Sequence, residues 1–187
     1  SVISVWAYNA KGDWLYVDGI IKRQDMSVNI EDLFRFVSIY KPQSVGIEIT
    51  GQQKGFVSWL RQEQIRRNIW FVFAKDGNTK EEGLRPNTSK LVRFNTVVPL
   101  FKSRKIWFPE DLKDSMELKE AMDEILHVTS SGFKSVHDDF IDTVSMLPLM
   151  LPWKPVEDSF SHDIPEDDVY SKYRRTESTY SLDSYIV

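Results

Sequence analysis

The sequence contains no cysteine and no long apolar run. Without cysteine it can form neither a disulfide framework nor a thiolate metal site. No apolar stretch approaches the roughly 18–20 residues that span a bilayer, and no segment resembles a signal peptide. We therefore expect a soluble protein that suits a reducing compartment and has no membrane partner.

Two further features are missing. No Asp or Glu occurs in residues 1–12, although the rest of the chain is rich in acids. No phosphate-binding loop of the form GxxxxGK[ST] occurs anywhere, which excludes a P-loop ATPase from these residues. The chain also begins directly with a strand-like run and no initiator methionine, so we expect it to be a fragment of a longer protein.

The net charge of −4 is unevenly distributed. Residues 153–187 hold eight acids and four bases, which leaves 20 of each in residues 1–152. We expect a single domain over residues 1–152, followed by an acidic C-terminal tail over residues 153–187.

The hydrophobic pattern predicts an α/β fold. Residues 1–8 and 14–21 alternate in polarity and flank a turn, which predicts an antiparallel hairpin. The β-branched and aromatic runs at 45–49 and 69–73 predict buried parallel strands. Helical periodicity and a short edge strand at 105–108 complete the pattern. The predicted helices cover about 27–40, 55–66, 89–102, 116–128 and 137–150.

One predicted helix begins with an unusual cluster of charge. In "SVHDDFIDTVSML", residues 135–147, Asp139 and Asp142 are three positions apart and share one helix face. A single Asp would be an ordinary helix cap, and acids suit a helix N-terminus. Capping does not explain the second acid on that face. It also does not explain Glu48, which interrupts the apolar run "VGIEI" unless the strand is half exposed.

Metal-assisted phosphodiester cleavage needs such a set of carboxylates. Mg²⁺ and Mn²⁺ prefer oxygen ligands. Two such ions about 4 Å apart can activate water and stabilise the leaving oxygen. Acids from a central strand and from a helix N-terminus can converge on the pair. Bound cations would then offset the charge of the helix.

At this point a family resemblance is evident. "VGIEITGQQKGF", followed far downstream by "HDDFIDTVSML", resembles the nuclease domain of the large terminase subunits of tailed phages. The resemblance covers about residues 1–152. It implies an RNase H-like fold: a mixed central sheet with an antiparallel hairpin, then parallel strands, and helices on both faces.

The resemblance also implies function and partners. Such a domain is a metal-dependent endodeoxyribonuclease that cuts concatemeric viral double-stranded DNA during genome packaging in the host cytoplasm. It is normally fused to an upstream ATPase, and its further partners are the portal and the small terminase subunit.

Residue by residue, Glu48 matches the second catalytic acid of the family and Asp139 the third. Asp142 matches an auxiliary acid of resolvase relatives, so all three are candidate catalytic residues and metal ligands. The family's first acid lies on a strand preceding the hairpin, which we expect to be missing upstream. Asp13 and Asp18 do not fit that position, and we expect the fragment to cut DNA poorly.

Basic residues near these acids are candidates for DNA binding, because phosphate contacts carry affinity without reading sequence. These candidates are Lys54, Lys80, Lys90, Arg93 and His137. His137 could instead orient a carboxylate or take part in the helix cap. Two other functions remain open: a non-catalytic RNase H-like module that binds DNA or a portal, and a nuclease like Holliday-junction resolvases or transposases.

Overall fold

A computed structural model describes residues 1–49, 54–129, 132–135, 137–155 and 184–186, without the side chains of 54 and 184–186. The helices are α1 (Met26–Tyr40), α2 (Lys54–Arg67), α3 (Lys90–Lys102), α4 (Met116–Leu126) and α5 (Asp139–Met146), with short 3-10 turns at Glu110–Leu112 and Leu147–Leu149. The strands are β1 (Val2–Asn9), β2 (Trp14–Ile21), β3 (Ile106–Trp107), β4 (Val128–Thr129), β5 (Gly132–Phe133) and β6 (Ser184–Ile186).

The predicted hairpin forms the centre of the molecule. β1 and β2 pair antiparallel, with a register shift after Val5. Gly12 closes the turn with a φ of 79°, a left-handed conformation that glycine adopts without strain. β3 pairs with β2 in parallel, and β6 pairs antiparallel with residues 7–9 of β1. The strand order is therefore β3-β2-β1-β6. The predicted edge strand at 105–108 is thereby confirmed as β3.

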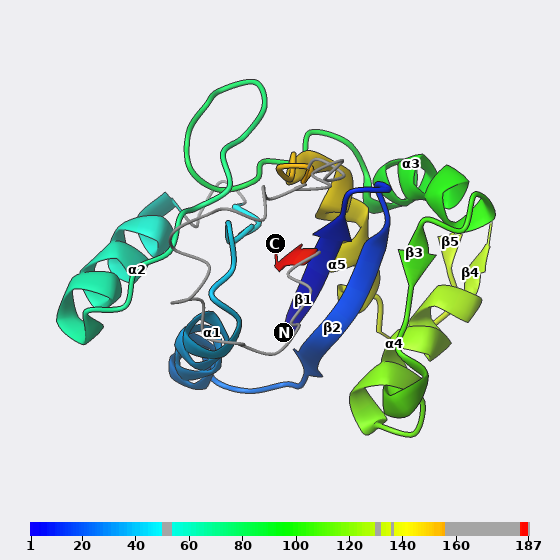
Figure 1. Cartoon of the computed structure of the whole chain (residues 1–187), viewed down its shortest axis with the longest axis horizontal. Coiled ribbons are helices and arrows are strands. Elements are labelled where there is room, and N and C mark those ends of the chain that lie inside the picture. Colours follow the sequence, from blue (N-terminus) through cyan, green and yellow to red (C-terminus); the bar gives the residue numbers. More distant parts are fainter. Residues whose placement is uncertain (50–53, 130–131, 136, 156–183, 187) are drawn as a thin grey trace, which may run out of the picture.

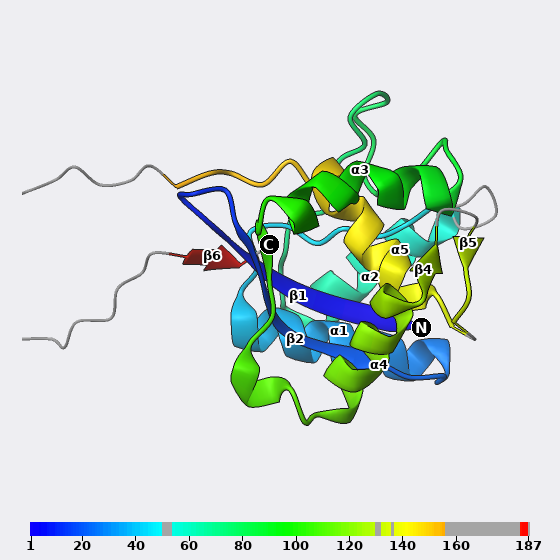
Figure 2. The ribbon, with the colours of Figure 1, turned by 90° about the vertical axis from the view of Figure 1, so that its right-hand side faces the viewer.

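Helices cover both faces of this sheet (Figures 1 and 2). Because side chains alternate along a strand, Trp6 and Tyr16 face the helices α3, α4 and α5 and enter the largest buried cluster. Val5 and Ile20 point the other way and pack against Phe36 of α1. The mixed α/β arrangement therefore agrees with the predicted fold class.

The two predicted buried strands differ from expectation. Residues 45–49 and 69–73 run extended and meet in a single parallel bridge, Val45 with Phe73; a second bridge joins Glu48 to Leu84. Phe73 is buried beside α1 and α2, whereas Val72 is 62% exposed. Among the described residues, each segment is paired on one side only, and neither joins the four-stranded sheet.

The last helix is shorter than predicted. α5 ends at Met146, and the chain continues as a 3-10 turn that contains Pro148 near its start. Proline lacks the N–H that a continued α-helix would need. Among the helices that the structure describes, none is long and apolar enough to cross a membrane.

Candidate active site

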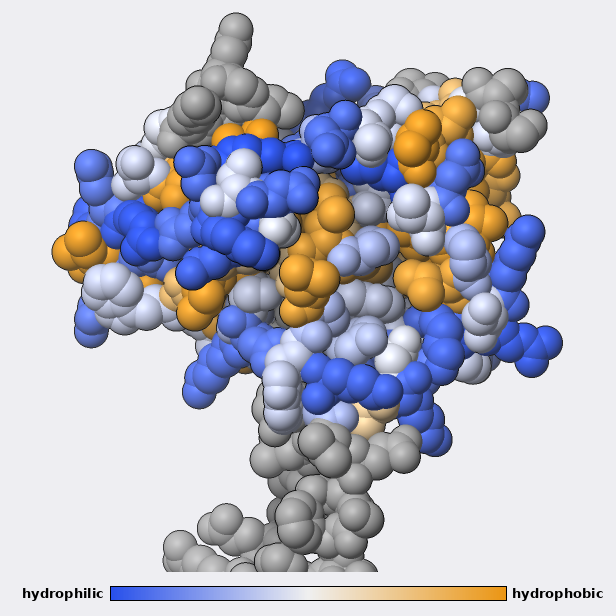
Figure 3. Space-filling view, turned by 90° about the horizontal axis from the view of Figure 1, so that it is seen from above, coloured by the Kyte–Doolittle hydropathy of each residue, from blue (hydrophilic) through white to orange (hydrophobic). Residues whose placement is uncertain are grey.

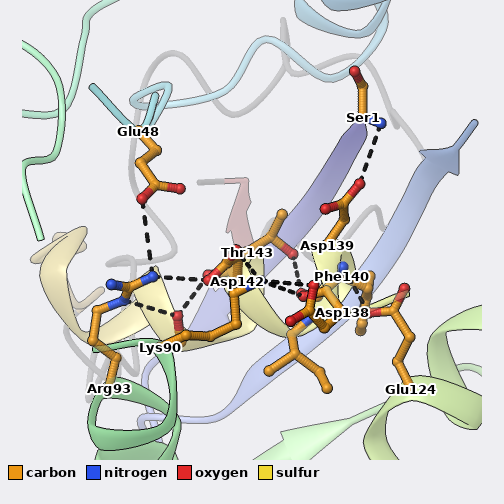
Figure 4. Close-up of polar contacts among 12 residues, drawn as sticks. Ser1, Glu48, Lys90, Arg93, Glu124, Asp138, Asp139, Phe140, Asp142 and Thr143 are labelled. Carbon is orange, nitrogen blue, oxygen red and sulfur yellow. Dashed lines mark hydrogen bonds and ion pairs between the residues drawn. The ribbon is translucent and has the colours of Figure 1, made fainter. Parts of the chain in front are cut away.

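The N-terminus of α5 is held by a buried carboxylate from another helix. Asp138 occupies the cap position, but its side chain makes no capping hydrogen bond. Instead, Oε2 of Glu124 on α4 accepts the N–H groups of Phe140 and Ile141 at 2.8 and 3.1 Å. Glu124 is 2% exposed, and this burial raises the pKa of its carboxyl. Glu124 thus holds the first turn of α5, which carries the acids, against α4 (Figure 4).

Two cations on α3 face the acids of α5. Lys90 Nζ lies 2.5 Å from Oδ2 of Asp142 and 2.9 Å from Oδ1 of Asp138. Nη2 of Arg93 lies 2.8 Å from Oδ1 of Asp142. Partial burial alone would lower the pKa of Lys90, but the hydrogen bonds to Asp142 and Asp138 outweigh it and raise that pKa. Side-chain cations, which we did not expect here, therefore compensate two of the three acids.

Glu48 lies at the edge of this cluster. Its Oε1 is 3.9 Å from Nη2 of Arg93, which is an ion pair without a hydrogen bond. Burial and, second, the charge of Asp142 raise the pKa of Glu48. Arg93 thus stands between the acid of the 45–49 segment and an acid of α5, as Figure 4 shows.

Asp139 is the most open of the acids on α5. Its side chain is 58% exposed, and its Oδ2 lies 3.4 Å from the amino group of Ser1. Figure 4 shows Asp139 directed toward Ser1 and away from the Lys90–Arg93 pair. Most of its oxygen lone pairs are consequently available to a ligand.

A groove separates β1 from the 45–49 segment. Its volume is about 600 Å³. One wall contains residues 1–6 and the other contains residues 44–48; Glu48, Asp139 and Asp142 all contribute to its lining. Much of the remaining lining is apolar, including Leu33, Val37 and Met150.

Backbone groups on both walls of the groove lack partners within the described chain. Val45 pairs with Val72 and Ala74, and Ile49 pairs with Leu84, on the side away from the groove. Backbone groups alternate in direction along an extended chain, so those of Gly46 and Glu48 face the groove. On the opposite wall, the Ser1 carbonyl accepts from Lys22 on the β2 side, and the groups of Val2 and Ser4 consequently face the groove.

The acids do not form a complete metal site by themselves. Within the described residues, no group of three or more His, Asp or Glu side chains is arranged to hold a metal ion. Asp142 is engaged by Lys90 and Arg93, which leaves Glu48 and Asp139 with available oxygens. The predicted ligands Glu48, Asp139 and Asp142 line one groove. Their side chains are not arranged to bind the same metal ion.

The other predicted residues lie in several places. Lys54 begins α2, and its side chain lies outside the description. Lys80 is in the 76–83 loop, where its Nζ donates to the carbonyl of Gly77 at 2.7 Å. His137 is exposed just before α5. The face shown in Figure 3 is largely hydrophilic with separate apolar patches.

Asp13 and Asp18 both make hydrogen bonds outside the groove. Asp13 bonds to Lys105 at 2.8 Å, and Asp18 accepts the hydroxyl of Tyr40 at 2.6 Å. Neither residue lines the groove. Neither residue is therefore placed beside Glu48 or Asp139 in the groove.

Sequence reasoning missed Glu124. The signal was present, because Glu124 follows Leu118 and Ala121 at intervals of three on the buried stripe of α4. An acid on an otherwise apolar helix face implies a buried partner.

The comparisons with known proteins agree with this arrangement. A family model described as a terminase RNaseH-like domain matches residues 3–151. No curated protein and no solved structure matches the chain. The matched range includes Glu48, the α3 cations and the acidic turn of α5. The chain therefore belongs to the terminase RNaseH-like domain family.

Proposed function

We propose that this chain is the endonuclease domain of a terminase and that it cleaves concatemeric viral double-stranded DNA with Mg²⁺ or Mn²⁺. The observation that carries the proposal is the position of Glu48 and Asp139. They come from an extended segment and a helix N-terminus, they line one groove, and each keeps oxygens available. Membership of the terminase RNaseH-like family supports nuclease chemistry at this place.

The site needs another acid, and we propose that an upstream strand supplies it from within the groove. Such a strand would lie between β1 and the 45–49 segment. Two observations support this position: both walls present backbone groups without partners among the described residues, and a groove of about 600 Å³ lies between them. A strand paired on both edges would turn the single bridges into a continuous sheet.

The wider setting follows from the family. We propose double-stranded DNA as substrate, an upstream ATPase in the same polypeptide, the portal and the small terminase subunit as partners, and the host cytoplasm as the place of action. Lys54, Lys80, Lys90, Arg93 and His137 remain proposed DNA contacts. Two of them, Lys90 and Arg93, already face carboxylates, so phosphate would have to compete with those pairs.

A plasmid-nicking assay with Mn²⁺ tests the proposal. It compares the 187-residue chain with a version lengthened at its N-terminus by the upstream residues of its gene. The chain itself should nick slowly or not at all, and the lengthened protein should nick in a metal-dependent way. Equal rates from both proteins would contradict the placement of the missing acid.

A second candidate is a non-catalytic module that binds DNA or a portal. The absence of three converging ligands among the described residues favours it. The two functions separate in the same assay. A lengthened protein that binds plasmid DNA but leaves it intact with both Mn²⁺ and Mg²⁺ would favour the binding module.

A further inference from the structure

Asp142 differs from the other acids of the groove because both of its oxygens are already used. Oδ1 receives Arg93 at 2.8 Å, and Oδ2 receives Lys90 at 2.5 Å. Glu48 has a single ion pair at 3.9 Å, and Asp139 a single contact at 3.4 Å. Each oxygen of Asp142 keeps a lone pair, but a metal ion at either oxygen would lie beside a positively charged donor, where like charges repel.

The two cations are held in place by their own surroundings. Arg93 is 11% exposed, and its Nη1 donates to the carbonyl of Thr88 at 2.8 Å. Its Nε lies 3.4 Å from the hydroxyl of Ser145 on α5. Lys90 bridges Asp138 and Asp142 from the first turn of α3. If either side chain left, the mostly buried carboxylate of Asp142 would lose a compensating charge, which is costly.

Charge balance points in the same direction. The cluster contains four carboxylates, Glu48, Asp138, Asp139 and Asp142, two side-chain cations and the amino group of Ser1 beside Asp139. One net negative charge remains, which a single divalent ion already outweighs. A second ion beside Asp142 would have to approach Lys90 and Arg93, where like charges repel.

We infer that Lys90 and Arg93 take the place of a metal ion at Asp142. Asp142 is then a positioning residue that orients the two cations. Glu48 and Asp139 are then the acids of the groove that are left to hold a divalent ion. The inference rests on the proposed metal chemistry of the same groove, and it differs from the two-ion site with Asp142 as a ligand that the sequence suggested.

Mn²⁺ titration of the protein lengthened at its N-terminus tests the inference, with free Mn²⁺ followed by its electron paramagnetic resonance signal. The variants are D142N, E48Q, D139N and K90M. The control is K102M, which removes the same charge from an exposed site on α3. Circular dichroism confirms that each variant is folded. No DNA and no cleavage are needed.

E48Q and D139N should weaken Mn²⁺ binding at least about tenfold, because each removes a ligand. D142N should weaken it less than about threefold, because only a neighbouring charge is lost. K90M should bind a further Mn²⁺ ion at the freed Asp142 and Asp138, whereas K102M should behave as the unaltered chain.

Two outcomes would overturn the inference. One is a loss in D142N as large as in D139N, and the other is a K90M protein that binds no additional ion. The proposed function fails separately, if E48Q and D139N bind Mn²⁺ as well as the unaltered chain does. The D142N arm keeps the inference testable even if K90M does not fold.

Discussion

Glu48 is a half-buried carboxylate whose ionisation opposes folding. Its pKa is raised from the ordinary value of 4.5, first by burial and then by the charge of Asp142. Its favourable contribution to the free energy of unfolding is therefore fully present below about pH 4.5, where the carboxyl is protonated. This contribution is lost as the pH rises through the higher folded-state pKa. The chain retains this carboxylate at a cost in stability, as functional sites often do.

E48Q should accordingly stabilise the protein in metal-free buffer at neutral pH. The glutamine never ionises, so its advantage over the unaltered chain should grow as the pH rises from below 4.5 toward 7. Thermal unfolding across this pH range measures the effect. A melting temperature that falls by the same amount at every pH would show that Glu48 has a structural role instead.

Glu124 has the opposite role, because its carboxylate satisfies two helix N–H groups. E124A should leave these donors unpaired in the core and destabilise the protein by roughly 1–3 kcal/mol. E124Q keeps an acceptor oxygen and should lose less. Urea unfolding compares both with E120A on the same helix, and an E124A value no larger than that control would contradict the role.

At the scale of elements, the groove predicts a pattern of hydrogen exchange. Val45 and Ile49 donate to Val72 and Leu84 at 2.8 and 2.9 Å, whereas Gly46 and Glu48 face the groove. The amides of Gly46 and Glu48 should exchange faster, because they have no backbone partner in the part of the chain that the structure describes. Nuclear magnetic resonance resolves the four amides individually. Equal protection of all four would contradict an open edge.

Some of the helices and strands could be predicted from the sequence, and others could not. The hairpin, α3 and α4 follow from local periodicity and are found within a few residues of the predicted positions. The segment at 45–49 has the composition of a central strand, but it pairs on one side only. Composition reports a preference for extended structure. A central strand also needs a partner strand on each of its two sides.

The site shows the same limit. Local spacing predicted that Asp139 and Asp142 share a helix face, and the family resemblance added Glu48; all three line one groove. Lys90 and Arg93 were predicted to contact DNA because DNA needs a basic approach and they share one helix face. No local pattern relates them to acids about 50 residues away. Their pairing with Asp142 arises from the packing of α3 against α5, a tertiary contact that no short pattern encodes.

At the scale of the whole molecule, the distribution of charge predicts the effect of the tail on DNA binding. Ending the chain after Pro155 removes eight acids and three bases and changes the net charge from −4 to +1. The shortened protein should bind DNA more tightly at low salt, and the difference should shrink as salt rises. Fluorescence anisotropy at several salt concentrations measures both. Equal affinities at low salt would show that the tail does not act through charge.

The central claim is that Glu48 and Asp139 belong to a metal-dependent nuclease site, and one measurement tests it most directly. Three forms of the protein lengthened at its N-terminus are incubated separately with supercoiled plasmid and Mn²⁺: the unaltered form, D139N, and D114N as a control at an exposed acid. We predict that the lengthened protein and D114N relax the plasmid, and that D139N and metal removal each abolish the reaction. Cleavage by D139N at the rate of the control would contradict the claim.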